Sequence, residues 1–165
     1  MKSKILLLIL LAASSMGFAN EGEKLKGKVT SVIDGNTVEI IAADGERYKI
    51  LLHGIDSPDP GQNFAENAKK LLEKLLLNKS ITITMHGKDR FGNRLGIIQI
   101  DGSPDPRREL IRAGLAWTTD GDPNGEFESL KNHAREQGLG LWSDENPTPP
   151  WLYRRQQTML QAKST

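Results

Sequence analysis

Three short polar segments contain residue types that often carry out chemistry in proteins. They are Asp34-Gly35-Asn36, Asp56-Ser57-Pro58-Asp59 and the segment from Asp89 to Arg94. Carboxylate and amide oxygens bind hard cations, a carboxylate can accept a proton from water, and guanidinium groups bind anions. Each segment also has a purely structural interpretation, as a hairpin turn, a polar strand exit and a solvated loop respectively. The choice between the chemical and the structural interpretation depends on the strands and helices that position these segments.

The first two segments lie at the ends of predicted strands. Runs of β-branched or alternating residues predict five strands, at residues 28–33, 37–41, 47–54, 80–85 and 95–100. Turn signals separate the first three strands, so we expect these strands to form a meander. A polar, glycine-containing loop joins the last two strands.

Three helices complete the predicted domain. Residues 62–77 have an apolar row at i, i+4 spacing, which is typical of a helix that faces a core. A short helix is expected between the N-cap Asp105 and Gly114, and a third over residues 126–137. The order of three strands, one helix, two strands and two helices predicts an α+β domain, a five-stranded OB-fold barrel with about three helices.

The N-terminal residues have the pattern of a targeting segment. Residues 1–19 combine a basic start, an apolar run and small residues at the end, so we expect a signal peptide and a secreted or periplasmic protein. The apolar run is shorter than the ~20 residues of a membrane-spanning helix, so no integral membrane segment is expected after cleavage. The rest of the chain divides into one domain, residues 26–143, and a tail, residues 144–165.

Composition narrows the classes of function. The chain has no cysteine, which excludes disulfides, thiolate metal sites and cysteine nucleophiles. It has 22 basic and 21 acidic residues, and removal of residues 1–19 takes away Lys2 and Lys4, which leaves a formal charge of about −1. This near-zero net charge excludes a strongly cationic nucleic-acid-binding protein, so any phosphate binding must depend on a small local group of basic residues. We also expect the protein to be a monomer.

The tail holds prolines followed by aromatic residues and arginines. Trp151, Tyr153, Arg154 and Arg155 follow Pro150 closely. Two interpretations stay open: the aromatic residues and arginines stack on bases and hold phosphates, or a proline-guided strap packs Trp151 and Tyr153 onto the barrel. We expect the last ten residues to be mobile.

Five motifs of the chain resemble, in the correct order, those of the staphylococcal nuclease family. They are Val32-Ile33-Asp34-Gly35-Asn36-Thr37, Gly54-Ile55-Asp56-Ser57-Pro58-Asp59, Asp89-Arg90-Phe91-Gly92-Asn93-Arg94-Leu95-Gly96, Arg112-Ala113-Gly114-Leu115-Ala116-Trp117 and Gly140-Leu141-Trp142-Ser143. The family patterns at the first three are close to V-x-D-G-D-T, G-I-D-[TSA]-P-E and D-R-Y-G-R-x-L-G. This family cuts phosphodiester bonds of DNA and RNA with Ca²⁺, so the resemblance implies a Ca²⁺-dependent endonuclease that binds nucleic acid.

The resemblance implies a weakened calcium site. It assigns Asp34 and Asp56 as metal ligands together with the Ser57 carbonyl, and it places Asn36 where the family has a second aspartate. Asparagine keeps an oxygen donor but loses a charge, so Ca²⁺ should bind more weakly. The family's catalytic glutamate falls on Asp59, which is one methylene shorter and therefore reaches less far towards water.

Both arginines of the family pattern are missing. Their positions hold Leu51 and Asn93, and one such arginine can be worth ~10³–10⁵ in the rate of phosphoryl transfer. Three substitutes are candidates for substrate binding. Lys49 lies on the same predicted strand face as Leu51, Arg94 needs a bulge in order to face inward, and Arg90 belongs to the loop.

Two classes of function stay open from the sequence. The first is a weak or altered Ca²⁺-dependent nuclease, which the surviving aspartates favour. The second is a non-catalytic OB-fold module, a pseudoenzyme that binds nucleic acid, a protein or a cell-envelope ligand. The missing arginines favour lost or strongly reduced catalysis.

Overall fold

The protein is described by a computed structural model that covers residues 22–119, 122 and 124–163. The expected signal peptide falls outside these residues. The strands are β1 (Lys24–Asp34), β2 (Thr37–Ala42), β3 (Arg47–Leu52), β4 (Ile55–Asp56), β5 (Ser80–Lys88), β6 (Arg94–Gln99) and β7 (Trp117–Thr118). The helices are α1 (Ala65–Leu76), α2 (Pro106–Arg112), α3 (Glu126–Glu136) and α4 (Pro150–Lys163), with a short 3₁₀ turn at Gly140–Ser143.

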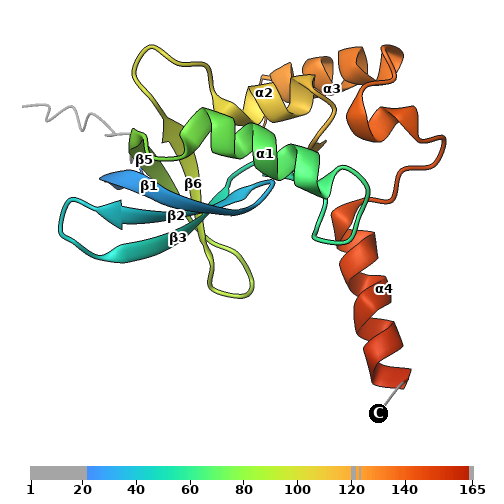
Figure 1. The fold of residues 1–165 in the computed structure, drawn as a ribbon, viewed down its shortest axis with the longest axis horizontal. Coiled ribbons are helices and arrows are strands. Elements are labelled where there is room, and N and C mark those ends of the chain that lie inside the picture. The colour runs from blue at the N-terminus through green and yellow to red at the C-terminus, as the bar shows by residue number, and fades with distance from the viewer. Residues whose placement is uncertain (1–21, 120–121, 123, 164–165) are drawn as a thin grey trace, which may run out of the picture.

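Five of the strands close into a barrel in the order β1-β2-β3-β6-β5 (Figure 1). All neighbouring pairs are antiparallel except β3 and β6, which run parallel. This is the predicted α+β barrel with helices, so the fold class is confirmed. Two strands were not predicted: the two-residue strands β4 and β7, which pair with each other in a separate small sheet.

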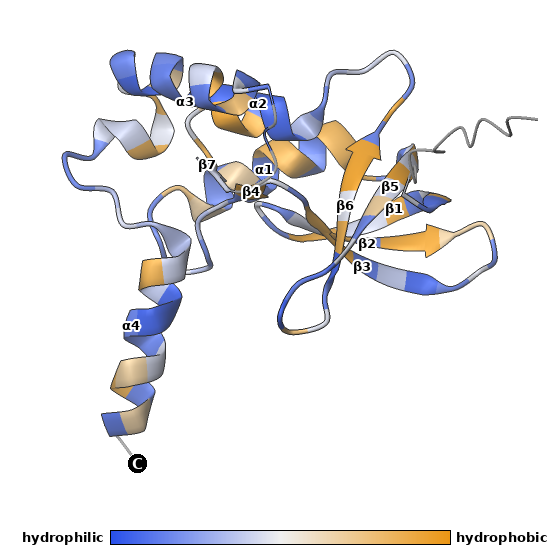
Figure 2. Cartoon of the chain, turned by 180° about the vertical axis from the view of Figure 1, so that it is seen from behind, coloured by the Kyte–Doolittle hydropathy of each residue, from blue (hydrophilic) through white to orange (hydrophobic). Residues whose placement is uncertain are grey.

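The barrel interior is filled by aliphatic side chains that alternate along the strands. Val38 and Ile40 of β2 and Ile50 of β3 are fully buried, and Figure 2 shows apolar stretches along the barrel strands. Helix α1 adds the fully buried Leu72 and Leu76, which belong to the same core cluster. The i, i+4 row predicted from the sequence therefore closes the core from outside the barrel.

The β1–β2 turn is held against the segment that follows β4. Gly35 is buried, and a Cβ atom there would lie 2.6 Å from the Cβ atoms of both Ser57 and Ala68, so only glycine fits. The Ser57 hydroxyl donates a hydrogen bond to the Gly35 carbonyl at 3.1 Å. This close approach fixes the Asp34 turn relative to Asp56 and Asp59.

The C-terminal tail differs most from its prediction, because residues 150–163 form a helix. Figure 1 shows α4 projecting away from the body that the barrel and the other helices form. Its first turn is anchored through Trp151, whose ring meets Trp117 edge to face at 5.7 Å. The preceding connection is held by Gln62, whose side chain donates to the Thr148 carbonyl at 2.9 Å. After the prolines the tail continues as a helix to Lys163, an element that the sequence did not predict.

Among the described residues, no helix has the length and apolar character needed to cross a bilayer.

Candidate functional site

A pocket of about 830 Å³ lies beside the barrel and contains most of the site residues predicted from the sequence. We call it the carboxylate pocket, after the aspartates Asp34, Asp56 and Asp59; a fourth aspartate, Asp89, lines it from the β5–β6 loop. The β1–β2 turn supplies Asp34, and the segment beginning at β4 supplies Asp56 and Asp59. Because the closely packed Gly35 holds these two segments together, residues far apart in the sequence lie near one another.

Helix α4 places a guanidinium group across two of these carboxylates. Arg154 Nη2 lies 2.6 Å from Asp56 Oδ2, and Arg154 Nη1 lies 3.0 Å from both carboxylate oxygens of Asp59. A fourth hydrogen bond joins Nη1 to Asp56 Oδ1 at 3.3 Å. One arginine therefore neutralises the two acids that the resemblance assigns to metal binding and to catalysis.

Burial shapes the ionisation of these acids. The Asp56 side chain is 14% exposed, and its desolvation raises its pKa even though Arg154 acts in the opposite direction. Burial likewise raises the pKa of Asp59 against the effect of Arg154, and the nearby charges of Asp56 and Asp34 raise it further. The hydrogen bond and charge of Asp56 raise the pKa of Arg154 despite partial burial. The three acids are thus close enough to repel one another, and the guanidinium compensates for this repulsion.

The oxygen donors suit a hard cation in their chemistry, but their arrangement does not fit one. All four carboxylate oxygens of Asp56 and Asp59 accept hydrogen bonds from Arg154. Asp34 Oδ1 accepts a hydrogen bond from the Asn36 backbone amide at 3.0 Å. In the part of the chain that the structure describes, no cluster of three or more metal-binding side chains has the geometry of a metal site. A cation such as Ca²⁺ would have to displace Arg154 first.

The two positions that lack an arginine face the same pocket. Leu51 and Lys49, both on β3, line it, as strand parity predicted. Asn93 lines it from the β5–β6 loop and donates a hydrogen bond from its side chain to Asp89 at 2.9 Å. At these positions the pocket therefore offers an aliphatic group and an amide.

Asp89 has a structural role in its loop. It accepts hydrogen bonds from the backbone amides of Phe91 and Asn93, both at 2.8 Å, as well as from the Asn93 side chain. Burial alone would raise the pKa of Asp89, but these hydrogen bonds outweigh it and hold the pKa below its usual value. Asp89 thus stabilises its own loop, and both Asp89 and its neighbour Arg90 line the pocket.

Two predicted site residues do not line the pocket. The guanidinium of Arg94 lies 4.5 Å from the centre of the Tyr48 ring. The pairing of β5 with β6 is irregular between Met85 and Lys88, next to Arg94, but this irregularity does not bring Arg94 into the pocket lining. Ser57 is 1% exposed, and its hydroxyl is bound to Gly35. Its contribution is to hold the turn in place.

Arg154 is the site residue that the sequence did not identify. The tail was recognised as a possible phosphate-binding segment, but its pairing with the aspartates was not predicted. A signal was present: Pro150 is a favourable first helical residue, and no glycine or further proline follows it up to residue 163. On a helix, Trp151, Arg154 and Arg155 share one face.

The fold and site together define a class, an OB-fold barrel with a carboxylate-lined pocket at its side. Residues 49–144 match the family described as staphylococcal nuclease homologue, and the chain belongs to this family. The match includes Asp56, Asp59, Leu51 and Asn93. The Asp34 turn and helix α4 lie outside it.

Relatives with nuclease names cover most of the chain. A protein of Escherichia coli O157:H7 named "Uncharacterized endonuclease" is 32% identical over 79% of this chain and 85% of its own length. A protein of the same name from Haemophilus influenzae is 30% identical over 96% of this chain and 89% of its own length. The "Micrococcal nuclease" of Shigella flexneri is 30% identical over 79% of this chain and 80% of its own length.

Proposed function

We propose that this protein binds nucleic acid at the carboxylate pocket and hydrolyses phosphodiester bonds only weakly or not at all. One observation carries the proposal. Leu51 and Asn93 occupy the positions where the family pattern has arginines, and both face the pocket. In phosphoryl transfer an arginine stabilises charge that develops on the phosphate, and one such group can be worth ~10³–10⁵ in rate.

The other cations of the pocket do not replace the charge stabilisation that arginines at positions 51 and 93 would provide. Lys49 is present, but an ammonium group lacks the fork that binds two phosphate oxygens. Arg90 also lines the pocket, but it lies on the β5–β6 loop with its guanidinium over the Phe91 ring, and not at either family arginine position. Arg154 is held by Asp56 and Asp59. Asp59 is paired in the same way and is not free to take a proton from water.

Calcium has a reduced role in this proposal. In the family, the cation supplies positive charge for an anionic phosphate. Here Asn36 brings no charge, and Arg154 already neutralises two of the three acids. We expect Ca²⁺ to bind weakly, in competition with this arginine.

Cleavage assays test the proposal directly. Purified protein is incubated with single-stranded DNA, duplex DNA and RNA, in Ca²⁺ and in chelator, beside an Asp34→Ala/Asp59→Ala double variant. We expect binding of at least one of these nucleic acids, with cleavage within about tenfold of the double variant. Strong Ca²⁺-dependent cleavage that disappears in the double variant contradicts the reduced activity.

A second function is a non-catalytic module for a protein or cell-envelope ligand. The balanced charge of the chain, +1 in total, favours this alternative over binding of long nucleic acid. Absence of binding to DNA and RNA from folded protein would support it.

We further propose that residues 1–19 direct export of the protein. A basic start, an apolar run and small residues at the end support a cleaved signal. Mass spectrometry of protein from the cell envelope or medium should find a chain that begins at or near Asn20. A cytoplasmic chain that retains Met1 contradicts the export.

A further inference from the structure

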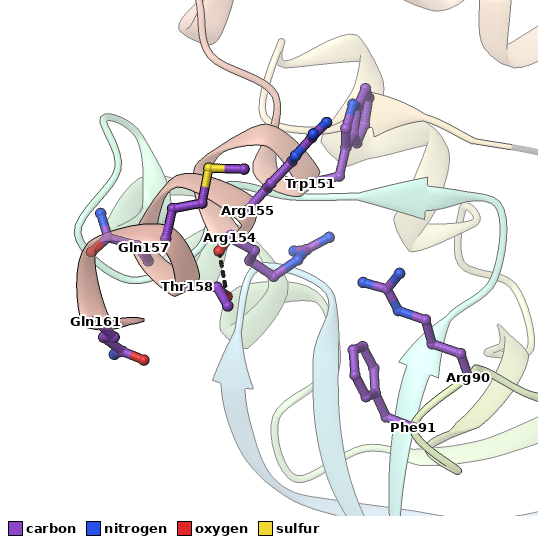
Figure 3. A pocket seen from close by; sticks show the side chains of 9 residues that line it. Arg90, Phe91, Trp151, Arg154, Arg155, Gln157, Thr158 and Gln161 are labelled. Carbon is purple, nitrogen blue, oxygen red and sulfur yellow. Dashed lines mark hydrogen bonds between the residues drawn. The ribbon is translucent and has the colours of Figure 1, made fainter. Parts of the chain in front are cut away.

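A second groove lies next to the carboxylate pocket, between the β5–β6 loop and α4. It has a volume of about 680 Å³, and we call it the outer groove. Arg90 and Phe91 line it from the loop, and Trp151, Arg154 and Arg155 line it from the helix. Figure 3 shows Arg154 extending from α4 towards the side on which Arg90 and Phe91 lie.

The outer groove is positive, whereas the rest of the protein is close to neutral. Three arginines line it, and its lining contains no aspartate or glutamate. Arg154 is engaged by Asp56 and Asp59, so Arg90 and Arg155 are the cations left for a ligand. Within the described residues, neither of these two forms an ion pair with an acid. A chain of near-neutral net charge thus concentrates cations where an anion could lie.

The outer groove also exposes two aromatic rings. Phe91 is 72% exposed and Trp151 is 43% exposed. The Arg90 guanidinium lies 4.6 Å from the centre of the Phe91 ring, and Trp117 holds an edge contact with Trp151. Trp151 is therefore fixed in place while part of its ring stays open. An exposed ring beside a free guanidinium is the arrangement that stacks on unpaired bases and binds their phosphates.

The outer groove leads into the carboxylate pocket. Arg90, Phe91, Trp151 and Arg154 line both. A polyanion in the outer groove would place a phosphate near Arg154, which then has two competing partners, the phosphate and the aspartates. One strand could therefore occupy the outer groove and reach the pocket continuously.

From these observations we infer that the outer groove binds a short single-stranded nucleic acid segment, with bases on Phe91 and Trp151 and phosphates on Arg90 and Arg155. The inference rests on the proposed function, because it names the strand that approaches the same pocket. It adds a contribution from α4, which lies outside the residues that match the family. Duplex DNA is disfavoured because its bases are already stacked within the helix and cannot reach the two rings.

Binding measurements in chelator test the inference without cleavage. The purified protein is titrated against a labelled oligothymidylate about 12 nucleotides long and against a duplex of the same length, with fluorescence anisotropy as the readout. The test variant is Phe91→Ala/Arg155→Gln, and thermal unfolding checks that it is folded. The matched control is Arg47→Gln, which removes one charge from an exposed position on β3, outside the outer groove.

We expect the single strand to bind more tightly than the duplex, and Phe91→Ala/Arg155→Gln to weaken this binding at least about tenfold. Arg47→Gln should change it less than about twofold. Normal binding by the test variant would overturn the inference and leave the proposed function standing. Absence of any binding by the unaltered protein would overturn both. Equal binding of duplex and single strand overturns the role of base stacking.

An acidic protein is the alternative ligand for the outer groove. Polyglutamate is added as a competitor at a charge concentration equal to that of the oligonucleotide. If it displaces the oligonucleotide completely and binds with the same dependence on Phe91 and Arg155, the groove recognises charge alone and the inference fails. Weak displacement, with a dependence on Phe91 only for the oligonucleotide, supports recognition of bases.

Discussion

Arg154 Nη2 donates a hydrogen bond to Asp56 Oδ2 at 2.6 Å, across 98 positions of the chain. The Arg154 side chain is 43% exposed, so water screens the pair and its contribution to stability is modest. Its larger effect concerns ligands, because a cation or a phosphate must compete with it. The pair therefore links the occupancy of the carboxylate pocket to the position of α4.

Replacement of Arg154 should strengthen calcium binding. Arg154→Gln frees the oxygens of Asp56 and Asp59, and we expect the affinity for Ca²⁺ to rise about threefold to tenfold, an increase suited to a partly exposed ion pair. Isothermal titration calorimetry measures the change. Arg155→Gln, on the same helix but without a contact to the acids, should leave the affinity unchanged. An equal rise of the Ca²⁺ affinity in both variants would show that the loss of one positive charge raises the affinity, and not the release of Asp56 and Asp59.

Restoration of the missing arginines should restore cleavage. Both Leu51 and Asn93 line the pocket, so guanidinium groups at these positions would enter it. We expect Leu51→Arg/Asn93→Arg to cleave single-stranded DNA in Ca²⁺ roughly 10²-fold faster than the unaltered chain. Initial rates measure this, and Leu51→Gln/Asn93→Gln is the control for size and polarity. An increase of the same size in the glutamine pair would rule out charge stabilisation as the missing factor.

The packing of α1 on the barrel should be a main source of stability. Leu72 is fully buried in the core cluster, so Leu72→Ala should lower the free energy of unfolding by about 2–5 kcal/mol. Urea unfolding followed by tryptophan fluorescence measures the loss. Leu77, one residue beyond α1, is 38% exposed, and Leu77→Ala should cost less than about 1 kcal/mol. Similar losses for both would mean that α1 does not close the core.

Much of the barrel could be predicted because its signals are local. Strand alternation and turn residues predicted the five barrel strands, and parity placed Lys49 and Leu51 on one face. Parity also predicted that Arg94 lies on the face opposite to Asn93, and in the structure Asn93 lines the pocket whereas Arg94 lies over the Tyr48 ring. The two-residue strands β4 and β7 were missed because such short segments show no period. They form only where the fold brings them together.

The least predictable feature was the role of α4 in the site. The prolines, aromatic residues and arginines of the tail left two interpretations open, a segment that binds nucleic acid and a strap packed on the barrel, although Pro150 also suits the first turn of a helix. The contact of Arg154 with Asp56 depends on the packing of the tail against Gln62 and Trp117. Local periodicity carries no information on such tertiary contacts. The sequence therefore identified Arg154 as a possible phosphate-binding residue but did not predict its pairing with Asp56 and Asp59.

His53 should make the stability of the protein depend on pH. Its ring stacks on His86 at 4.5 Å between centroids, and its Nδ1 is buried with no hydrogen-bond partner among the residues that the structure describes. Burial lowers the pKa of His53, and the nearby charges of His86 and Arg107 lower it further. The folded chain thus holds fewer protons at this site than the unfolded chain. Stability from this group is present above the unfolded pKa of about 6.5 and is lost as the pH falls through the lower folded pKa.

We therefore expect His53→Gln to reduce the loss of thermal stability between about pH 7.5 and pH 5.5. Melting temperatures at both pH values measure the loss, and His133→Gln, at an exposed position of α3, is the control and should behave like the unaltered chain. Burial and the stacked pair explain the direction of the effect, because a proton on His53 is poorly solvated and must face the His86 ring and Arg107. A loss of stability in His53→Gln as large as that of the unaltered chain would show that other groups govern the acid side of the stability curve.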